Sequence, residues 1–192
     1  VSLALGNSRL NSEFANSIID GTDPVRVLPD VDGIANFYTP QWSPDGQQIA
    51  LLSSGFNNNN DVEYGGLWIA DIDSDRLIGS VRQLASDIEI TDYTWSPDGN
   101  HVAAAAWVSG QSEIVIISTA DGTYQMAASA GSDGYFYHMH SSPNGNAVIY
   151  VYRTWFGTFS VGRVDIDDEF NAFNLTEDVG ASRSSPEWSQ GG

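Results

Sequence analysis

The chain has 192 residues, of which 41% are hydrophobic, so it is long enough to bury one substantial core. Asp and Glu outnumber Lys and Arg by 25 to 7, and a formal net charge of −18 would repel nucleic acid and anionic membrane surfaces. Cysteine is absent, which excludes disulfides and thiolate chemistry. The composition therefore predicts a globular, acidic protein that does not bind nucleic acid.

Membrane insertion is not expected either. A spanning helix needs roughly 18 apolar residues in a row, and no run in the sequence approaches that length. Loops rich in Asn, Ser and Gly, in a chain without a single Lys, favour an extracellular or periplasmic location. The acid excess can attract divalent cations or basic partners, although it also serves simply to keep a protein soluble.

Three short apolar runs come first along the chain, at 1–8, 14–20 and 25–29. They read VSLALGNS, FANSIID and VRVLP. Their length and their β-branched content predict three strands.

A phrase that begins Trp-Ser-Pro-Asp-Gly then recurs. Whole copies read WSPDGQQIALLSS from Trp42 and WSPDGNHVAAAAW from Trp95, and a third copy reads SSPNGNAVIYVY from Ser141. A truncated copy, PEWSQGG, closes the chain. We call the first position of each copy the key position; it holds Trp42, Trp95, Ser141 and Trp188, at spacings of 53, 46 and 47 residues.

Each phrase predicts a hairpin. Pro fixes φ near −65° inside the turn, and Gly supplies the left-handed residue that closes it. Strand-like runs follow at 66–73, 113–122 and 160–167, and shorter ones at 81–85, 124–129 and 172–176. Four strands in about 48 residues, joined by tight turns, are typical of a propeller blade.

The turn, the apolar strand after it, a strand like GLWIAD and an ending like NLT together resemble the TolB-type WD40-like β-propeller repeats. The resemblance covers nearly the whole chain and is strongest at 42–46 and 95–99. In the third copy Ser141 replaces Trp and Asn144 replaces Asp. The resemblance implies an all-β propeller with four four-stranded blades, one of them split between the termini.

The predicted blades are blade I (1–33 plus 183–192), blade II (34–88), blade III (89–132) and blade IV (133–182). Joining the C-terminal WSQGG to the N-terminal VSLALGNS rebuilds the repeated phrase, so the two ends are expected to form one hairpin. Pairing removes an exposed edge strand. The chain can close on itself, exchange strands with a second copy, or donate its strand to a neighbour in a filament.

The turns after the second strand of each blade, with the connectors between blades, are expected on one face, which we call the long-loop face. Exposed aromatic side chains favour sugar or protein contacts. For two aromatic residues of this face, Trp155 and Phe156, the alternative to binding a partner is that they cap the core between blades. The candidate binding residues on this face are Phe56, Tyr64, Trp155 and Phe156.

Acidic residues stand in every connector between blades, which predicts a carboxylate collar at the mouth of the propeller channel. Oxygen ligands from several loops suit Ca²⁺, although acids in polar connectors also lie simply in water. The candidate metal ligands are Asp30, Asp32, Asp87, Glu89, Asp133 and Asp178.

His138 and His140 form an H-x-H pair, and strand alternation would place both side chains on one face. Metal-holding histidines occur in propeller lyases that act on uronic-acid sugars. No G-x-S-x-G nucleophile elbow occurs, and a chain without Lys cannot form a P-loop.

The sequence thus favours a noncatalytic scaffold or binding module for protein contacts or self-assembly through the split blade. The alternatives are a carbohydrate-active or metal-dependent propeller enzyme and the propeller domain of a larger peptidase.

Overall fold

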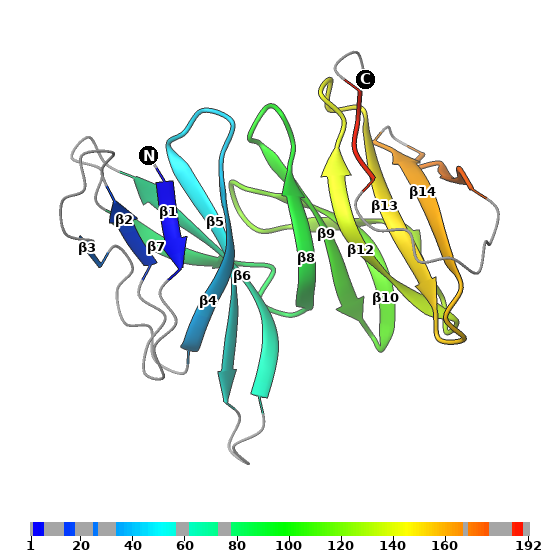
Figure 1. Cartoon of the computed structure of the whole chain (residues 1–192), viewed down its shortest axis with the longest axis horizontal. Coiled ribbons are helices and arrows are strands. Elements are labelled where there is room, and N and C mark those ends of the chain that lie inside the picture. Colours follow the sequence, from blue (N-terminus) through cyan, green and yellow to red (C-terminus); the bar gives the residue numbers. More distant parts are fainter. Residues whose placement is uncertain are drawn as a thin grey trace. The chain divides into compact units, whose positions relative to one another are not determined.

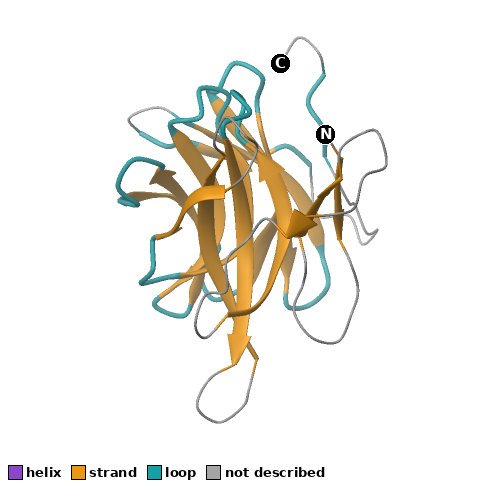
Figure 2. Ribbon diagram, turned by 90° about the vertical axis from the view of Figure 1, so that its left-hand side faces the viewer, coloured by secondary structure: helices purple, strands orange, loops and turns teal. Residues whose placement is uncertain are grey.

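The computed structural model of the chain describes residues 2–5, 14–17, 25–26, 34–56, 62–72, 78–166, 169–176 and 186–189. For the first three ranges, and for residues 35, 56, 62–64 and 78, it describes the backbone only. In this part of the chain all regular structure is β-strand, as Figure 2 shows. A helix long and apolar enough to cross a membrane is not found there.

The chain divides into two compact units, 1–83 and 84–192. The first unit holds two antiparallel sheets, with orders β1-β2-β3 and β4-β5-β6-β7 (Figure 1). Its strands are β1 (Ser2–Leu5), β2 (Phe14–Ser17), β3 (Val25–Arg26), β4 (Ile34–Trp42), β5 (Gln48–Phe56), β6 (Val62–Ile72) and β7 (Ile78–Leu84).

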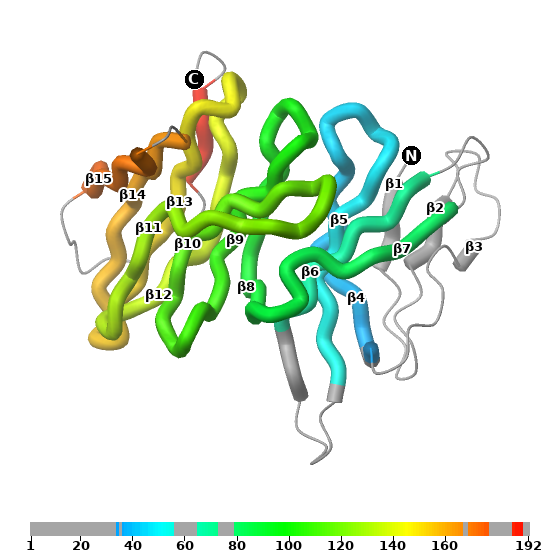
Figure 3. Tube along the Cα trace, turned by 180° about the vertical axis from the view of Figure 1, so that it is seen from behind, coloured from blue at the N-terminus to red at the C-terminus, as the bar shows by residue number. Residues whose placement is uncertain are grey.

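The second unit also holds two antiparallel sheets, with orders β8-β9-β10-β11 and β12-β13-β14-β15 (Figure 3). In both sheets, strands that follow one another in sequence lie side by side. The strands are β8 (Glu89–Trp95), β9 (His101–Val108), β10 (Gln111–Ser118), β11 (Tyr124–Ser129), β12 (Gly134–Ser141), β13 (Ala147–Thr154), β14 (Phe159–Asp165) and β15 (Ala172–Asn174).

This architecture confirms the all-β propeller fold that the repeat predicts, with three complete four-stranded sheets. The three N-terminal runs form β1, β2 and β3, in the order expected for the second to fourth strands of a blade. The remaining strand of this split blade, its first, is predicted within residues 183–192. Within its described part, residues 186–189, no strand forms, and closure of the split blade stays a prediction, as do the blade boundaries.

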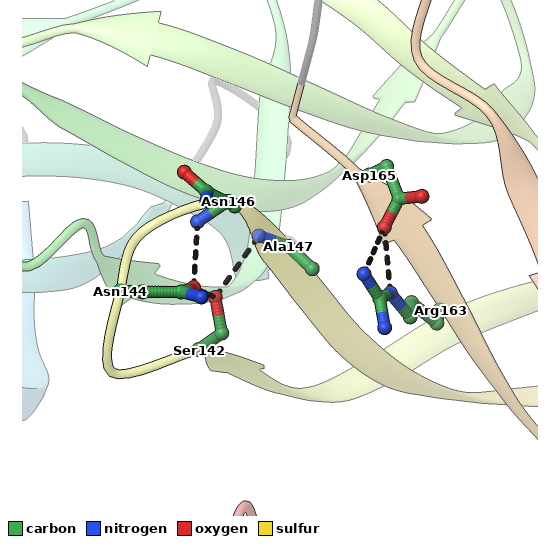
Figure 4. A network of polar contacts seen from close by, with 6 residues as sticks. All are labelled: Ser142, Asn144, Asn146, Ala147, Arg163 and Asp165. Carbon is green, nitrogen blue, oxygen red and sulfur yellow. Dashed lines mark hydrogen bonds and ion pairs between the residues drawn. The ribbon is translucent and has the colours of Figure 1, made fainter. Parts of the chain in front are cut away.

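The repeated turns have one geometry in all three copies. The serine hydroxyl donates to the residue two positions on, Ser43 to Asp45 at 2.6 Å and Ser142 to Asn144 at 2.7 Å. Figure 4 shows how the Asn144 side-chain oxygen also accepts from the Asn146 amide, 3.1 Å away. Gly145 closes this turn at a φ of 78°, as predicted for the left-handed position.

The core of the second unit lies between its two sheets. Small residues of β9, among them Ala103 and Ala105, are buried with Phe136 and Met139 of β12 and with Val148 and Tyr150 of β13. Burial raises the pKa of Tyr150 to about 12. Alanines on one sheet leave room for the aromatic rings of the next, so the two sheets pack closely.

Candidate functional site

The long-loop end of the second unit carries a group of aromatic side chains. The Phe156 side chain is 93% exposed and Trp155 is 57% exposed, both in the loop between β13 and β14. The Trp155 ring stacks on Trp107 with centroids 6.1 Å apart and planes at 15°. It also contacts Tyr135, at 5.2 Å. We call Trp107, Tyr135, Trp155 and Phe156 the aromatic surface.

Trp155 is held in place although most of it faces solvent. Its indole Nε1 donates to the Ser132 carbonyl at 3.0 Å, and its backbone amide donates to the Asp133 carbonyl at 3.0 Å. Both acceptors lie in the connector before β12. An exposed ring fixed in this way loses little conformational entropy when a ligand covers it.

Arg153 supports the same group from β13. Its guanidinium donates to the Tyr135 hydroxyl at 2.9 Å and lies 5.9 Å from the centre of that ring. It also lies 5.1 Å from the Phe159 ring. One cation therefore contacts two rings, which is a favourable arrangement even at an exposed position.

The aromatic candidates from the sequence separate into two pairs. Trp155 and Phe156 lie together, and Phe156 does not cap the core between blades. The backbones of Phe56 and Tyr64 lie in β5 and β6, opposite Val62 and Ser54, and their side chains fall outside the described residues. Trp107 and Tyr135 were not among the candidates; the only local signal is an aromatic residue next to a predicted turn or connector.

The candidate acids do not gather in the described part of the chain. Asp87 accepts from the Tyr124 hydroxyl at 3.2 Å, and Asp133 accepts from the Ser132 hydroxyl at 3.0 Å. Among the described residues no three His, Asp or Glu side chains form a group that could hold a metal ion. Asp30, Asp32 and Asp178 fall outside these residues, so a Ca²⁺ collar that includes them stays a prediction.

The H-x-H pair lies at an irregularity in β12. The pairing of β12 with β13 shifts between Tyr137 and His140, and His138 has a φ of 50°. Exposure nevertheless alternates across this bulge, since His138 and His140 are exposed and Met139 between them is buried.

Asp92 of β8 links the two sheets of the second unit near this bulge. Its carboxylate accepts from the backbone amide of Met139 at 3.1 Å and from that of Tyr93 at 2.9 Å. Burial raises the pKa of Asp92 from its ordinary value, while these amides and the nearby His138 act against the shift. Its role is to accept hydrogen bonds from backbone amides that would otherwise be buried without an acceptor.

A cavity of about 460 Å³ lies between the two sheets of the second unit. Its apolar wall includes Ala103, Ile116, Val148 and Ile166, and Ser141 faces into it. A second cavity of about 410 Å³ shares Ile116 and Ile166 with the first and extends to Tyr124. Volumes of this size are those of small-molecule sites.

No family model matches the sequence. An uncharacterized peptidase, YuxL, from Bacillus subtilis is 31% identical over 94 residues, which are 48% of this chain and 14% of that protein. The matched part thus spans only a small share of that relative.

Solved structures show the fold. A puromycin-hydrolyzing peptidase of Mycobacterium tuberculosis matches 90% of this chain with a TM-score of 0.61 at 14% identity. An auxiliary nutrient binding protein of Bacteroides thetaiotaomicron matches 83% with a TM-score of 0.52 at 13% identity. This chain covers 28% and 36% of those two proteins. The chain has the β-propeller fold of these two neighbours, of which one is a peptidase and the other a binding protein.

Proposed function

We propose that the chain is a noncatalytic β-propeller binding module that contacts a protein partner through the aromatic surface, in an extracellular or periplasmic setting. The observation that carries the proposal is Trp155, which is 57% exposed and yet fixed by two hydrogen bonds to the connector before β12. Rigid Trp and Tyr side chains are the residues that dominate protein interfaces.

Three further features support this proposal. Phe156 projects beside Trp155 with 93% of its side chain exposed, a cost in water that burial against a partner removes. Arg153 adds a cation within the group, and Arg is enriched at interfaces together with Trp and Tyr. The chain as a whole is strongly acidic, with a formal net charge of −18, which favours a basic partner.

The test compares capture by the purified, immobilised chain and by matched variants, using extracts of the source cells' envelope and medium. Trp155→Ala combined with Phe156→Ser should lose at least tenfold of a specific partner. Met126→Ser is the control, because Met126 is 60% exposed and lies in β11, outside the aromatic surface. Equal retention by all three proteins would count against the proposal.

A second candidate is the propeller part of a longer peptidase. The match to the Bacillus peptidase over 94 residues favours it. The nucleophile of such an enzyme would lie outside these 192 residues, because they contain no G-x-S-x-G elbow. A native mass well above 20.7 kDa in one polypeptide would support it, whereas multiples of that mass would support self-assembly through the split blade.

A further inference from the structure

The key position is filled by Trp in three copies of the repeat and by Ser in one. In the first unit, Trp42 is paired with Ile49 across β4 and β5. Trp42 and Ile72 both pack against the cluster that contains Ile49 and Leu51. A key tryptophan therefore covers the apolar residues that the following strands present.

Trp188 shows which way a key side chain faces in the second unit. Its indole Nε1 donates to the His140 carbonyl at 2.9 Å, and the Arg163 guanidinium lies 5.8 Å from its ring. His140 and Arg163 belong to β12 and β14. The tryptophan that follows a sheet in sequence thus lies on that preceding sheet.

Ser141 occupies this position in β12 and leaves the corresponding space open. It pairs with Val148 as Trp42 pairs with Ile49. The cavity of about 460 Å³ lies at Ser141, and its wall on the preceding sheet includes Ala103 and Ile116. The position that lacks an indole thus coincides with the opening between these two sheets.

Polar groups line the turn end of this cavity. Asp98, His101 and Asn146 lie there, and Pro97 packs close to Gly145, where an added Cβ would lie 3.4 Å from the proline ring. The hydrogen bond from the Ser96 hydroxyl is the main reason that the pKa of Asp98 is lowered from its ordinary value. The carboxylate is therefore ionised at neutral pH.

We propose that this cavity is a binding site for a small, flat aromatic molecule that carries a cationic group. The aromatic ring takes the space that a key tryptophan fills elsewhere, and the cation lies beside Asp98. The site is separate from the aromatic surface, and its ligand is distinct from the protein partner proposed above.

Size and chemistry select this class of ligand. A dry apolar cavity of about 150 Å³ is enough to take up benzene, and the present cavity is about 460 Å³, which leaves room for a larger ring and its substituent. Apolar side chains from both sheets provide the contacts for the ring faces. A carboxylate at the rim of an acidic protein favours a cation over an anion.

The test uses tryptamine, indole and indole-3-acetate, which share one ring and differ in charge. Titration calorimetry at about 0.15 M salt, where the Debye length is about 8 Å, should show tryptamine binding at least tenfold more tightly than indole-3-acetate. Asp98→Asn should reduce that ratio to within threefold. Its turn is expected to survive, because Asn144 makes the same hydrogen bonds in the third copy.

Ser141→Trp fills the cavity and should weaken tryptamine binding at least tenfold, with a rise in the thermal midpoint. Ser141→Ala, which leaves the space open, should bind within threefold of the unchanged chain. Should the tryptophan variant misfold, methyl NMR of the unchanged chain locates the ligand. Titration should then shift the methyl resonances of Ala103, Val148 and Ile166.

Two results would overturn the assignment of this cavity as a binding site. One is the absence of saturable binding by all three probes. The other is binding that perturbs the aromatic surface but not the three cavity methyl groups. Indole-3-acetate binding as tightly as tryptamine would overturn the assignment of a cation beside Asp98.

Discussion

Within the five residues of the turn, the third copy differs from the two whole copies at two positions, Ser141 and Asn144, and the structural consequences of the two differ. At Asn144 the turn is unchanged, because the side-chain oxygen accepts from Ser142 and from the Asn146 amide as Asp45 accepts from Ser43 and from the Gln47 amide. At Ser141, where the two whole copies have Trp, a cavity of about 460 Å³ lies beside the smaller side chain.

The difference shows that two parts of the repeat, the turn and the key position, have separate structural requirements. The turn depends on a single acceptor oxygen, which Asp and Asn both supply. The key position depends on volume, which Ser cannot supply. A repeat can therefore keep its hairpin while it gives up packing, and the space so gained is available for a ligand.

The largest expected effect is that of Trp95→Ser, which gives the second copy the key residue of the third. Trp95 is buried, with 6% of its surface exposed, and truncation of a buried Trp costs about 3–5 kcal/mol. Urea denaturation monitored by circular dichroism should show this loss in the free energy of unfolding.

Phe156→Ser is the matched control for that variant. Its ring is 93% exposed, and substitution at such a surface position changes stability by about 0.5 kcal/mol or less. Similar losses in the two variants would show that burial at the key position does not stabilise the fold.

A smaller loss is expected for Gly145→Ala, which tests the turn rather than the packing. Gly145 has a φ of 78°, and a residue with a Cβ in the left-handed region costs about 1–2 kcal/mol. Gly79→Ala is the control, because an added Cβ there meets only the Asp71 carbonyl oxygen at 3.9 Å. Chemical denaturation should separate the two, and an equal response would contradict a conformational requirement at the turn.

Much of the fold could be predicted from the sequence because turn chemistry and apolar runs mark the strands directly. The run at 124–129 coincides with β11 (Tyr124–Ser129), and the run at 172–176 contains β15 (Ala172–Asn174). The WSPDG turns fix where each hairpin reverses, so the strands on either side follow with little ambiguity.

The irregularities in the first strand of each complete sheet could not be predicted. Thr39 and His138 have φ values of 48° and 50°, and strand pairing shifts beside each of them. A bulge adds one residue to a strand without a distinctive residue type. The shift in strand register at the H-x-H pair therefore had no signal in the sequence, although the exposure of the two histidines agrees with alternation.

The candidate site was predicted only in part, for a related reason. Trp155 and Phe156 could be selected because the sequence places them in a loop between two predicted strands, where burial is not guaranteed. Trp107 joins them by stacking on Trp155 across a sequence separation of 48 residues, and no local pattern reports such a contact. The cavity did have a sequence signal, the replacement of Trp by Ser141, but its depth depends on how closely two sheets pack.

The smallest expected effect comes from exchanging Asp and Asn in two turns, through Asp98→Asn and Asn144→Asp. The Ser96 hydroxyl lowers the pKa of Asp98, so the ionised carboxylate stabilises the fold above the unfolded pKa of about 3.9. That contribution disappears as the pH falls through the lower folded pKa. Since the turn is solvent-exposed, it amounts to a few tenths of a kcal/mol at most.

Asp98→Asn should therefore be slightly less stable than the unchanged chain at pH 7 and equal to it near pH 2. Asn144→Asp should gain a similar increment at pH 7 and lose it over the same acid range. Urea denaturation at about 0.2 M salt, which screens the net charge of −18, measures both. A pH-independent difference would show that the two turns differ by packing rather than by the charge on the acceptor. The independence of turn and key position would then need another explanation.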